Sequence, residues 1–268
     1  MKILILSGNH PRHRYIIEPV FHHFKNIKVI MHKRESVKEG PTTICFNNIE
    51  RSLVIRHFKN RFIKETKKFG NKIIKDLVNK ENFFEIDKDL SVNFIKKKLK
   101  KFKPDMVFSI GFSLINKQVI AFLPKNTINI HLGLSPWYRG SATLMWPTYN
   151  LEPWKTGVTF HRISDHIDDG PILHQSVPVM KKNYDVIDLS IAAISKAKID
   201  LNRILKKIKK KEKLKFVKQK FNGKTYFTNS FRGSHLLVIY KFFNNKVCKY
   251  FFKTKKQLPK FKIINFLR

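Results

Sequence analysis

The sequence has little cysteine, few acidic residues and no long apolar run. Its two cysteines, Cys45 and Cys248, lie far apart, which argues against a disulfide framework and against a cysteine-ligated zinc site. Such scarcity is typical of a reducing cytoplasm. The apolar run at residues 3–6 is too short for a signal peptide, and no window approaches the roughly 18 apolar residues of a membrane span. We therefore expect a cytoplasmic protein without a membrane span.

Acidic residues are outnumbered by basic ones throughout the chain. There are 19 Asp and Glu against 55 Lys and Arg, and the formal net charge is +36. Residues 201–268 hold 21 basic residues and a single acid, Glu212. This surplus favours anionic partners such as nucleic acid, the phosphates of a nucleotide-sugar or a membrane surface. The compositional bias of an A/T-rich genome, which enriches Lys, Asn, Ile and Phe, is an equally good explanation.

Apolar periodicity predicts one large α/β domain followed by an appendage. Strands are expected at residues 2–6, 27–31, 83–86, 105–111, 127–132, 157–163 and 172–179, and helices at 12–24, 49–69, 73–78, 90–102, from 141 onward, and at 185–207. Residues 1–208 would form this large domain, and residues 209–268 a small C-terminal subdomain or tail. In the tail, Asn222-Gly223 predicts a hairpin turn. Its alternating aromatic and basic residues fit RNA binding or a dimerising subdomain equally well.

Polar side chains gather where the strand at 127–132 ends. Asn129 and His131 are two residues apart and so point to the same side of that strand, and Gly133 follows them. Ligands of open α/β sheets bind at such carboxyl ends. Asp168, in a turn-rich loop, lies close enough along the chain to join them. An amide, an imidazole and a carboxylate together can hold a carbonyl and an amine. Taken singly, His131 also fits a buried core residue and Asp168 a turn former.

The order of these residues resembles the formyltetrahydrofolate-dependent formyltransferases. That family includes methionyl-tRNA formyltransferase, glycinamide ribonucleotide formyltransferase and the N-formyltransferases of nucleotide-linked amino sugars. Its signature is an Asn-x-His near a strand end, a Pro-containing loop, and an Asp-x-Gly after a Gly-led strand. The matching residues here are Asn129, His131, Pro136, Gly157, Asp168 and Gly170. The resemblance implies a doubly wound, mostly parallel, Rossmann-like sheet.

The resemblance also implies roles for the site residues. Asn129 would donate to the formyl oxygen, His131 would polarise or protonate that oxygen or the leaving nitrogen, and Asp168 would accept the proton of the amine. His161 matches a second histidine found in some members. It is expected to contact the catalytic residues and not the substrate. The spacing of His166, Asp168 and Asp169 matches no standard metal motif, so no metal is expected.

Binding residues follow from the same resemblance. N10-formyltetrahydrofolate, the implied co-substrate, would contact Gly111, Phe112, Leu114, Ile115, Asp165 and Ile167. The acceptor would contact Asn9, His10 and Arg12 at the first strand-to-helix turn, and Tyr138, Arg139 and Gly140 after the strand at 127–132. Amides at a helix start suit a phosphate.

Several acceptors are compatible with this family. A nucleotide-linked amino sugar is the first choice, because Pro136-x-x-Arg139-Gly140 matches the sugar and tRNA branches. Pro11, which has no amide proton, argues against glycinamide ribonucleotide. The tail is short for the domain that methionyl-tRNA formyltransferases append, although its charge keeps tRNA as an alternative partner. A non-catalytic RNA-binding homologue is the remaining alternative, and the intact Asn129, His131 and Asp168 argue against it. The sequence does not decide whether the protein forms a homodimer.

Overall fold

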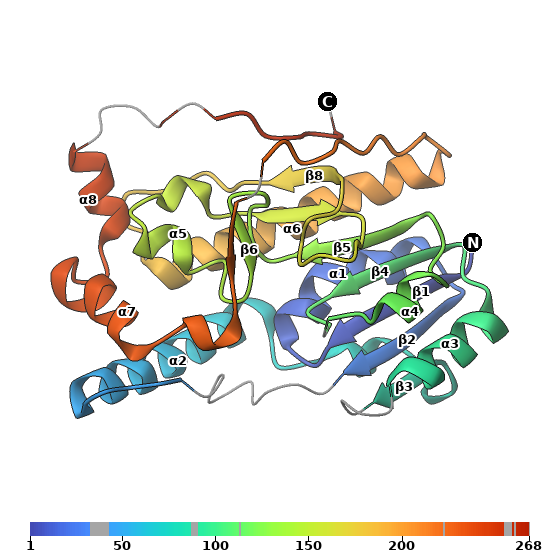
Figure 1. The fold of residues 1–268 in the computed structure, drawn as a ribbon, viewed down its shortest axis with the longest axis horizontal. Helices are drawn as coiled ribbons and strands as arrows, with labels where there is room; N and C mark the ends of the chain where they lie inside the picture. Colours follow the sequence, from blue (N-terminus) through green and yellow to red (C-terminus); the bar gives the residue numbers. More distant parts are fainter. Residues whose placement is uncertain are drawn as a thin grey trace.

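A seven-stranded sheet forms the centre of the protein (Figure 1). The computed structural model describes residues 1–32, 43–86, 91–112, 114–221, 223–254, 259 and 261–267. The strands lie in the order β3 (Phe83–Ile86), β2 (Ile27–His32), β1 (Ile3–Gly8), β4 (Met106–Ile110), β5 (Thr127–His131), β7 (Val158–His161) and β8 (Ile172–Ser176). The five strands from β3 to β5 are parallel, and β7 runs antiparallel to both of its neighbours. The predicted doubly wound, mostly parallel sheet is confirmed.

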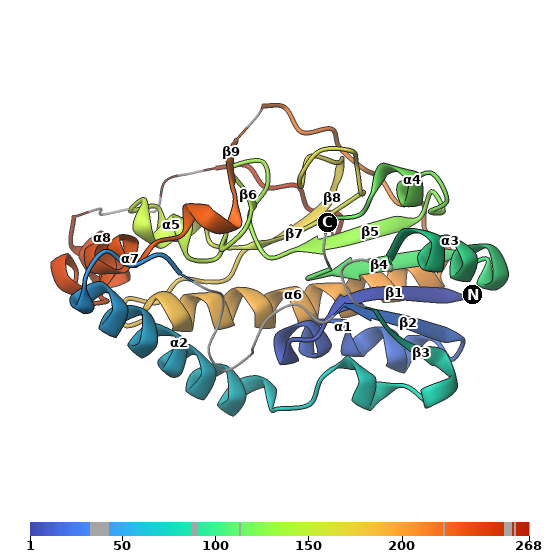
Figure 2. The same cartoon turned by 60° about the horizontal axis from the view of Figure 1, so that its bottom comes forward.

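Helices cover both faces of this sheet (Figure 2). Ile3 and Ile5 of β1 belong to the apolar cluster that contains α1 (Pro11–His23) and α6 (Val186–Lys209). Leu4 and Leu6 alternate with them and pack in the cluster of α3 (Ser91–Phe102) and α4 (Lys117–Ile120). Every residue of β1 is buried. A strand buried on both faces needs a continuous apolar sequence, which is why the strand pattern was readable.

Two sets of polar contacts fix α6, the longest helix. The side chain of Asp185 caps it by accepting from the backbone N–H groups of Ile187 and Asp188, a contact that typically stabilises a helix by about 1 kcal/mol. Further along, the buried Asp200 accepts from Ser176 Oγ at 2.7 Å and lies 3.1 Å from His174 Nε2. Because His174 and Ser176 belong to β8, these contacts hold α6 against the sheet.

The remaining elements lie between the strands and beyond α6. They are α2 (Asn48–Phe69), the 3-10 turns Ile74–Leu77, Lys80–Asn82, Pro153–Lys155 and Thr228–Ser230, the short strands β6 (Tyr138–Gly140) and β9 (Lys224–Tyr226), and the helices α5 (Trp146–Tyr149), α7 (Gly233–Leu237), the π-helix Val238–Phe242 and α8 (Val247–Thr254). Among the residues that the structure describes, no helix is both long and apolar enough to cross a membrane.

The described residues beyond Lys209 contact the first part of the chain at several places. Strand β9 pairs in parallel with β6, and α7 packs against α2. Val217 forms a two-way backbone pair with Ile172 of β8. Near the end of the chain, the N–H of Gln175 donates to the carbonyl of Ile264 at 2.9 Å. The segment predicted as a subdomain or tail therefore lies against β8 of the sheet and beside β6 and α2 (Figure 1).

Two local predictions are wrong, and a third falls partly outside the described residues. The hairpin turn predicted at Asn222-Gly223 includes Asn222, which lies outside the described residues. The strand that follows, β9, pairs with β6, and a Cβ on Gly223 would lie 1.5 Å from the Pro136 carbonyl oxygen, so this glycine serves a close backbone approach. No helix begins at residue 141, because Ala142 has a φ of +55° and Pro147 favours a helix start at Trp146. The helix expected at 73–78 is a single 3-10 turn.

Candidate active site

Strand β5 brings the first two predicted site residues to the carboxyl end of the parallel strands. Asn129 and His131 point to the same side of β5, as their spacing of two requires. The antiparallel neighbour β7 places His161 directly opposite Asn129. His131 and His161 are 7% and 2% exposed, so both imidazoles lie below the surface.

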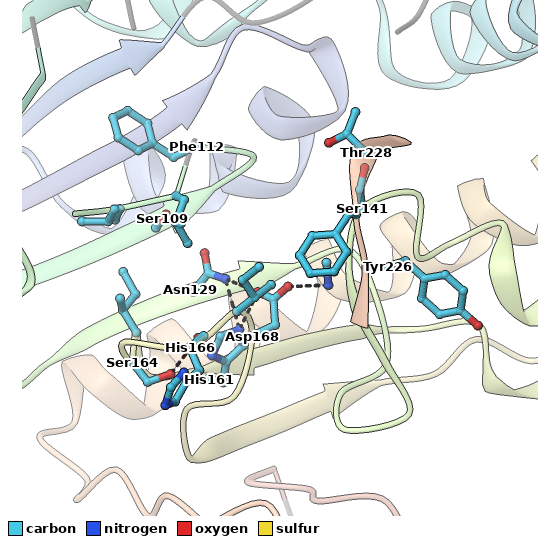
Figure 3. A pocket seen from close by; sticks show the side chains of 16 residues that line it. Ser109, Phe112, Asn129, Ser141, His161, Ser164, His166, Asp168, Tyr226 and Thr228 are labelled. Carbon is cyan, nitrogen blue, oxygen red and sulfur yellow. Dashed lines mark hydrogen bonds and ion pairs between the residues drawn. The ribbon is translucent and has the colours of Figure 1, made fainter. Parts of the chain in front are cut away.

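The loop between β7 and β8 delivers the third residue, Asp168, to the same place (Figure 3). Its Oδ1 accepts from Asn129 Nδ2 at 3.3 Å, and its Oδ2 accepts from the backbone N–H of Gly140 at 2.9 Å. His131 Nδ1 lies 3.0 Å from Oδ2, and His161 Nε2 lies 3.3 Å from Oδ1. Asn129, His131, Asp168 and His161 thus form one connected polar cluster.

Burial and these contacts set the charges of the cluster. Burial alone would raise the pKa of the Asp168 carboxyl, but the neighbouring His131 and the Gly140 N–H hold that pKa well below its ordinary value. Burial lowers the pKa of His131, and the opposing effect of Asp168 offsets this only in part. Near neutral pH the cluster therefore holds an ionised carboxylate beside a neutral imidazole.

The hydrogen-bond partners fix how His161 and Asn129 are arranged. His161 Nδ1 lies 2.6 Å from the Arg162 carbonyl oxygen, which can only accept, so Nδ1 carries the proton and Nε2 is an acceptor. Asn129 Nδ2 donates to that Nε2 at 3.1 Å and to Asp168 at 3.3 Å. Both amide hydrogens are thus in use. Donation to a substrate oxygen would replace the longer contact, the one to Asp168.

His131 faces an acceptor on each side of its ring. Its Nε2 lies 3.0 Å from the Tyr138 carbonyl oxygen and its Nδ1 lies 3.0 Å from Asp168 Oδ2. A neutral imidazole has one N–H and can satisfy only one of these oxygens, whereas an imidazolium satisfies both. The cluster is therefore arranged to accept one proton, which makes His131 and Asp168 together a suitable base.

Two cavities meet at this cluster. The first has a volume of about 280 Å³ and the second of about 330 Å³. Both are lined by Asn129 and Asp168, together with Phe112, Gly140, Ser141 and Thr228. In the first cavity, Ser109 and Phe112 form one wall and Ser141 and Thr228 the opposite one, with Asn129 and Asp168 between them (Figure 3). Two substrates in these cavities would meet at the same amide and carboxylate.

Most of the predicted folate-contacting residues line a cavity. Leu114, Ile115 and Ile167 line the first, Phe112 lines both, and Gly111 lines the second. Leu114 is 76% exposed, which is unusual for a large apolar side chain and fits a position at the mouth of the cavity. Asp165 lines neither cavity; its carboxylate lies 3.6 Å from Lys117 Nζ, and half of its side chain is exposed.

The predicted acceptor-contacting residues divide into two groups. Asn9, His10 and Arg12, at the start of α1, line the second cavity, and Gly140 lines both. Tyr138 and Arg139 line neither. The buried Tyr138 hydroxyl donates to Glu152, and the buried Arg139 guanidinium lies 2.7 Å from Asp169. Both side chains are therefore held by protein partners, and their contact with the acceptor stays a prediction.

Several cavity residues escaped the sequence analysis. Tyr226, Phe227 and Thr228, in and after β9, line the first cavity, while Arg61 of α2 and Phe231 line the second. The sequence shows that the tail is aromatic and basic. It contains no local signal for the parallel pairing of β9 with β6, which brings these residues close to β5. Among the described residues, no group of three or more His, Cys, Asp or Glu side chains is arranged to hold a metal ion.

Comparisons with known proteins give the family of this chain. A family model described as formyl transferase matches residues 50–204 and so includes Asn129, His131 and Asp168. The GDP-perosamine N-formyltransferase of Brucella melitensis is 31% identical over 108 residues, which are 40% of this chain and 41% of that protein. The methionyl-tRNA formyltransferase of Thermodesulfovibrio yellowstonii is 42% identical over 84 residues, 31% of this chain and 27% of that protein. The matches thus span less than half the length of these relatives.

Solved structures extend the likeness over the rest of the chain. An N-formyltransferase of Helicobacter canadensis, solved with folinic acid and dTDP-3-aminofucose, covers 98% of this chain and 87% of its own, with a TM-score of 0.60 and 18% identity. A 4-N formyltransferase of Francisella tularensis covers 85% of this chain and 77% of its own, with a TM-score of 0.54 and 17% identity. Identities this low show the fold alone. The match over more than half of the sequence shows that this chain belongs to the formyl transferase family.

Proposed function

We propose that this enzyme transfers a formyl group from N10-formyltetrahydrofolate to a primary amine on a nucleotide-linked amino sugar. One observation carries the proposal: Asn129 and Asp168 line both cavities, so a donor in one and an acceptor in the other would react across them. A transfer between two substrates requires such a shared wall, since the reacting atoms must approach to about 3–3.5 Å.

The first cavity suits the donor. Phe112, Leu114, Ile115, Ile167 and Phe227 give it apolar walls, between which the flat rings of a folate would stack. Ser109, Ser164 and His166 add a few polar groups that can orient ring nitrogens. Phe227, like Leu114, is more than half exposed, so both are available to cover a bound ring system.

The second cavity suits an anionic acceptor that carries an aromatic base. Arg12 and Arg61 line it, and guanidinium groups favour phosphates. Phe58 and Phe231 lie in the same lining and offer rings against which a base can stack. Two of the relatives named above point the same way, since one is described as acting on GDP-perosamine and the other was solved with dTDP-3-aminofucose.

The proposed chemistry uses each member of the polar cluster. The amine attacks the formyl carbon, a C–N bond to the acceptor forms, and the bond from the formyl carbon to N10 of the folate breaks. Asn129 donates to the formyl oxygen as negative charge develops on it. The proton released by the amine goes to the pair of His131 and Asp168, which can accept one proton, and is then passed to the departing N10. Tetrahydrofolate and the formamido product leave without net change in the enzyme.

Methionyl-tRNA is the second candidate acceptor. The methionyl-tRNA formyltransferase match reaches 42% identity, and the net charge of +36 favours a polyanion. Glycinamide ribonucleotide is disfavoured, because Pro11 stands at the start of α1 where an amide donor would be needed.

A tetrahydrofolate-release assay distinguishes these acceptors. Purified enzyme is given N10-formyltetrahydrofolate and, separately, several nucleotide-linked amino sugars, charged initiator methionyl-tRNA and glycinamide ribonucleotide, with Asp168→Asn as the blank. Release with a nucleotide-linked sugar supports the proposal. The proposal is contradicted if methionyl-tRNA is the only acceptor that gives release, or if none of the acceptors in the panel gives release.

A further inference from the structure

The side-chain amide of Gln219 spans the turn that carries Asp168. Its Nε2 donates to the carbonyl oxygens of Asp168 and Gly170, both at 2.9 Å. These are the residues at the two ends of the Asp-x-Gly turn, so one amide group uses both of its hydrogens to fix their separation. Gln219 lies outside the segment that the family model matches, residues 50–204.

The oxygen of the same amide contacts Arg139, which precedes the other neighbour of the carboxylate, Gly140. Gln219 Oε1 accepts from Arg139 at 2.6 Å, and the same guanidinium lies 2.7 Å from Asp169. Arg139 precedes Gly140, whose N–H donates to the Asp168 carboxylate at 2.9 Å. Arg139, Gln219 and the Asp168 turn thus form a closed set of contacts around the carboxylate.

The backbone of Gln219 is itself anchored. Val217, two residues earlier, exchanges backbone hydrogen bonds of 2.7 and 2.8 Å with Ile172 at the start of β8. Ile172 directly follows the Asp168 loop in the chain. The segment that carries Gln219 is therefore bonded to β8 at the point where the Asp168 loop enters the sheet.

The turn needs such support because its conformation is unfavourable by itself. Asp168 has a φ of +48°, in the left-handed region that a side chain disfavours. At Gly170 a Cβ would lie 1.8 Å from the Arg162 carbonyl oxygen, so the loop is tightly folded on itself. Residues in strained conformations persist only where surrounding contacts hold them. Here the contacts include two hydrogen bonds from one distant side chain.

We propose that Gln219 is a positioning residue for catalysis: its two N–H groups hold the Asp168 turn so that the carboxylate faces His131 and Asn129. The inference rests on the formyl transfer proposed above. Gln219 touches no reacting atom in this scheme and acts through Asp168.

Two variants separate the possible roles of Gln219. Gln219→Met keeps the length of the side chain but removes both donors and the acceptor. Gln219→Glu keeps the acceptor for Arg139 and removes the donors. Gln118→Met is the matched control, because Gln118 is an exposed glutamine on α4 that accepts from Lys96 at the surface. Tetrahydrofolate release gives kcat and KM for each, and thermal melting reports folding.

We expect both Gln219 variants to lose about 10- to 100-fold in kcat with KM nearly unchanged, as typically follows loss of a supporting contact. Gln118→Met should retain wild-type kcat. Wild-type kcat in both Gln219 variants would overturn the inference. Loss in Gln219→Met with full activity in Gln219→Glu would also overturn it, since the essential contact would then be the one to Arg139.

A second readout does not depend on turnover. ¹⁵N NMR of the histidine ring nitrogens reports the contacts of His131 and His161 with Asp168, and Asp168→Asn identifies the affected signals. Both Gln219 variants should move these signals, whereas Gln118→Met should not; unmoved signals would overturn the inference. If the wild-type enzyme releases no tetrahydrofolate with any acceptor, the proposed function fails, and the NMR result still decides whether Gln219 holds the turn.

Discussion

His57 of α2 gives the protein a specific sensitivity to acid. Its side chain is buried against Phe58 and Tyr240, and burial lowers its pKa from the ordinary 6.5 to about 3. The folded protein therefore holds His57 neutral, while the unfolded chain binds a proton as the pH falls below 6.5. The stabilisation is complete above pH 6.5 and is lost progressively below it. Between pH 7 and pH 5 this single residue should remove about 2 kcal/mol from the free energy of unfolding.

The measurement is urea denaturation at pH 7 and pH 5, followed by tryptophan fluorescence. Wild type is compared with His57→Gln, which keeps a polar partner for the Tyr240 hydroxyl but does not titrate, and with His22→Gln, an exposed histidine of α1. Because His10, His131 and the carboxylates are common to all three proteins, their contributions cancel in the comparison. The pH-dependent loss in His57→Gln should be smaller than in wild type by about 2 kcal/mol.

Equal losses in wild type and His57→Gln would refute the reasoning, because they would show that His57 takes up its proton without unfolding. An equal reduction in His22→Gln would refute it as well, since the effect would then not depend on burial.

Three further predictions follow from the site and the core. Asn129→Ala should lower kcat about 100-fold and Asp168→Asn between about 10²- and 10⁴-fold, because they remove the oxyanion donor and the carboxylate of the base; near-normal rates with a folded protein would contradict the assigned roles. Phe227→Ala should raise KM for the folate donor and leave KM for the acceptor unchanged, with the exposed Phe242→Ala as control, and equal effects on both substrates would contradict the assignment of the cavities. Asp200→Ala should cost about 3–5 kcal/mol in urea denaturation, because it leaves buried His174 and Ser176 without their partner, and a loss below 1 kcal/mol would show that the network relaxes.

The parts of the structure that could be predicted are those with a local signal. Strand β5 was readable because a buried strand is continuously apolar, and the two polar side chains at its end stood out against that run. Asp168 was found because it lies on the loop just before the last sheet strand and matches a known motif. The helix predicted at residues 185–207 matches α6 (Val186–Lys209), because its apolar residues recur at helical spacing.

The parts that could not be predicted depend on contacts between distant residues. Gln219 is a polar residue in a basic stretch with no local signal. Its proposed role depends on its hydrogen bond to the Asp168 turn, 51 positions away in the chain. Arg139 fits the family motif, yet the structure uses it for Asp169 and Gln219, because its guanidinium is turned into the protein. A motif identifies which residue is present, whereas the direction of its side chain depends on its neighbours in space.

Through the pairing of β9 with β6, a stretch outside the family match supplies part of the walls of both cavities, next to the proposed catalytic residues. The proposed catalytic residues belong to residues 50–204, while Phe227, Thr228 and Phe231 line the cavities from a later stretch of the chain. Substitutions in that later stretch can reshape what the enzyme accepts while Asn129, His131 and Asp168 stay in place. A search for altered acceptor preference should therefore begin by randomising Thr228 and Phe231, which line the second cavity.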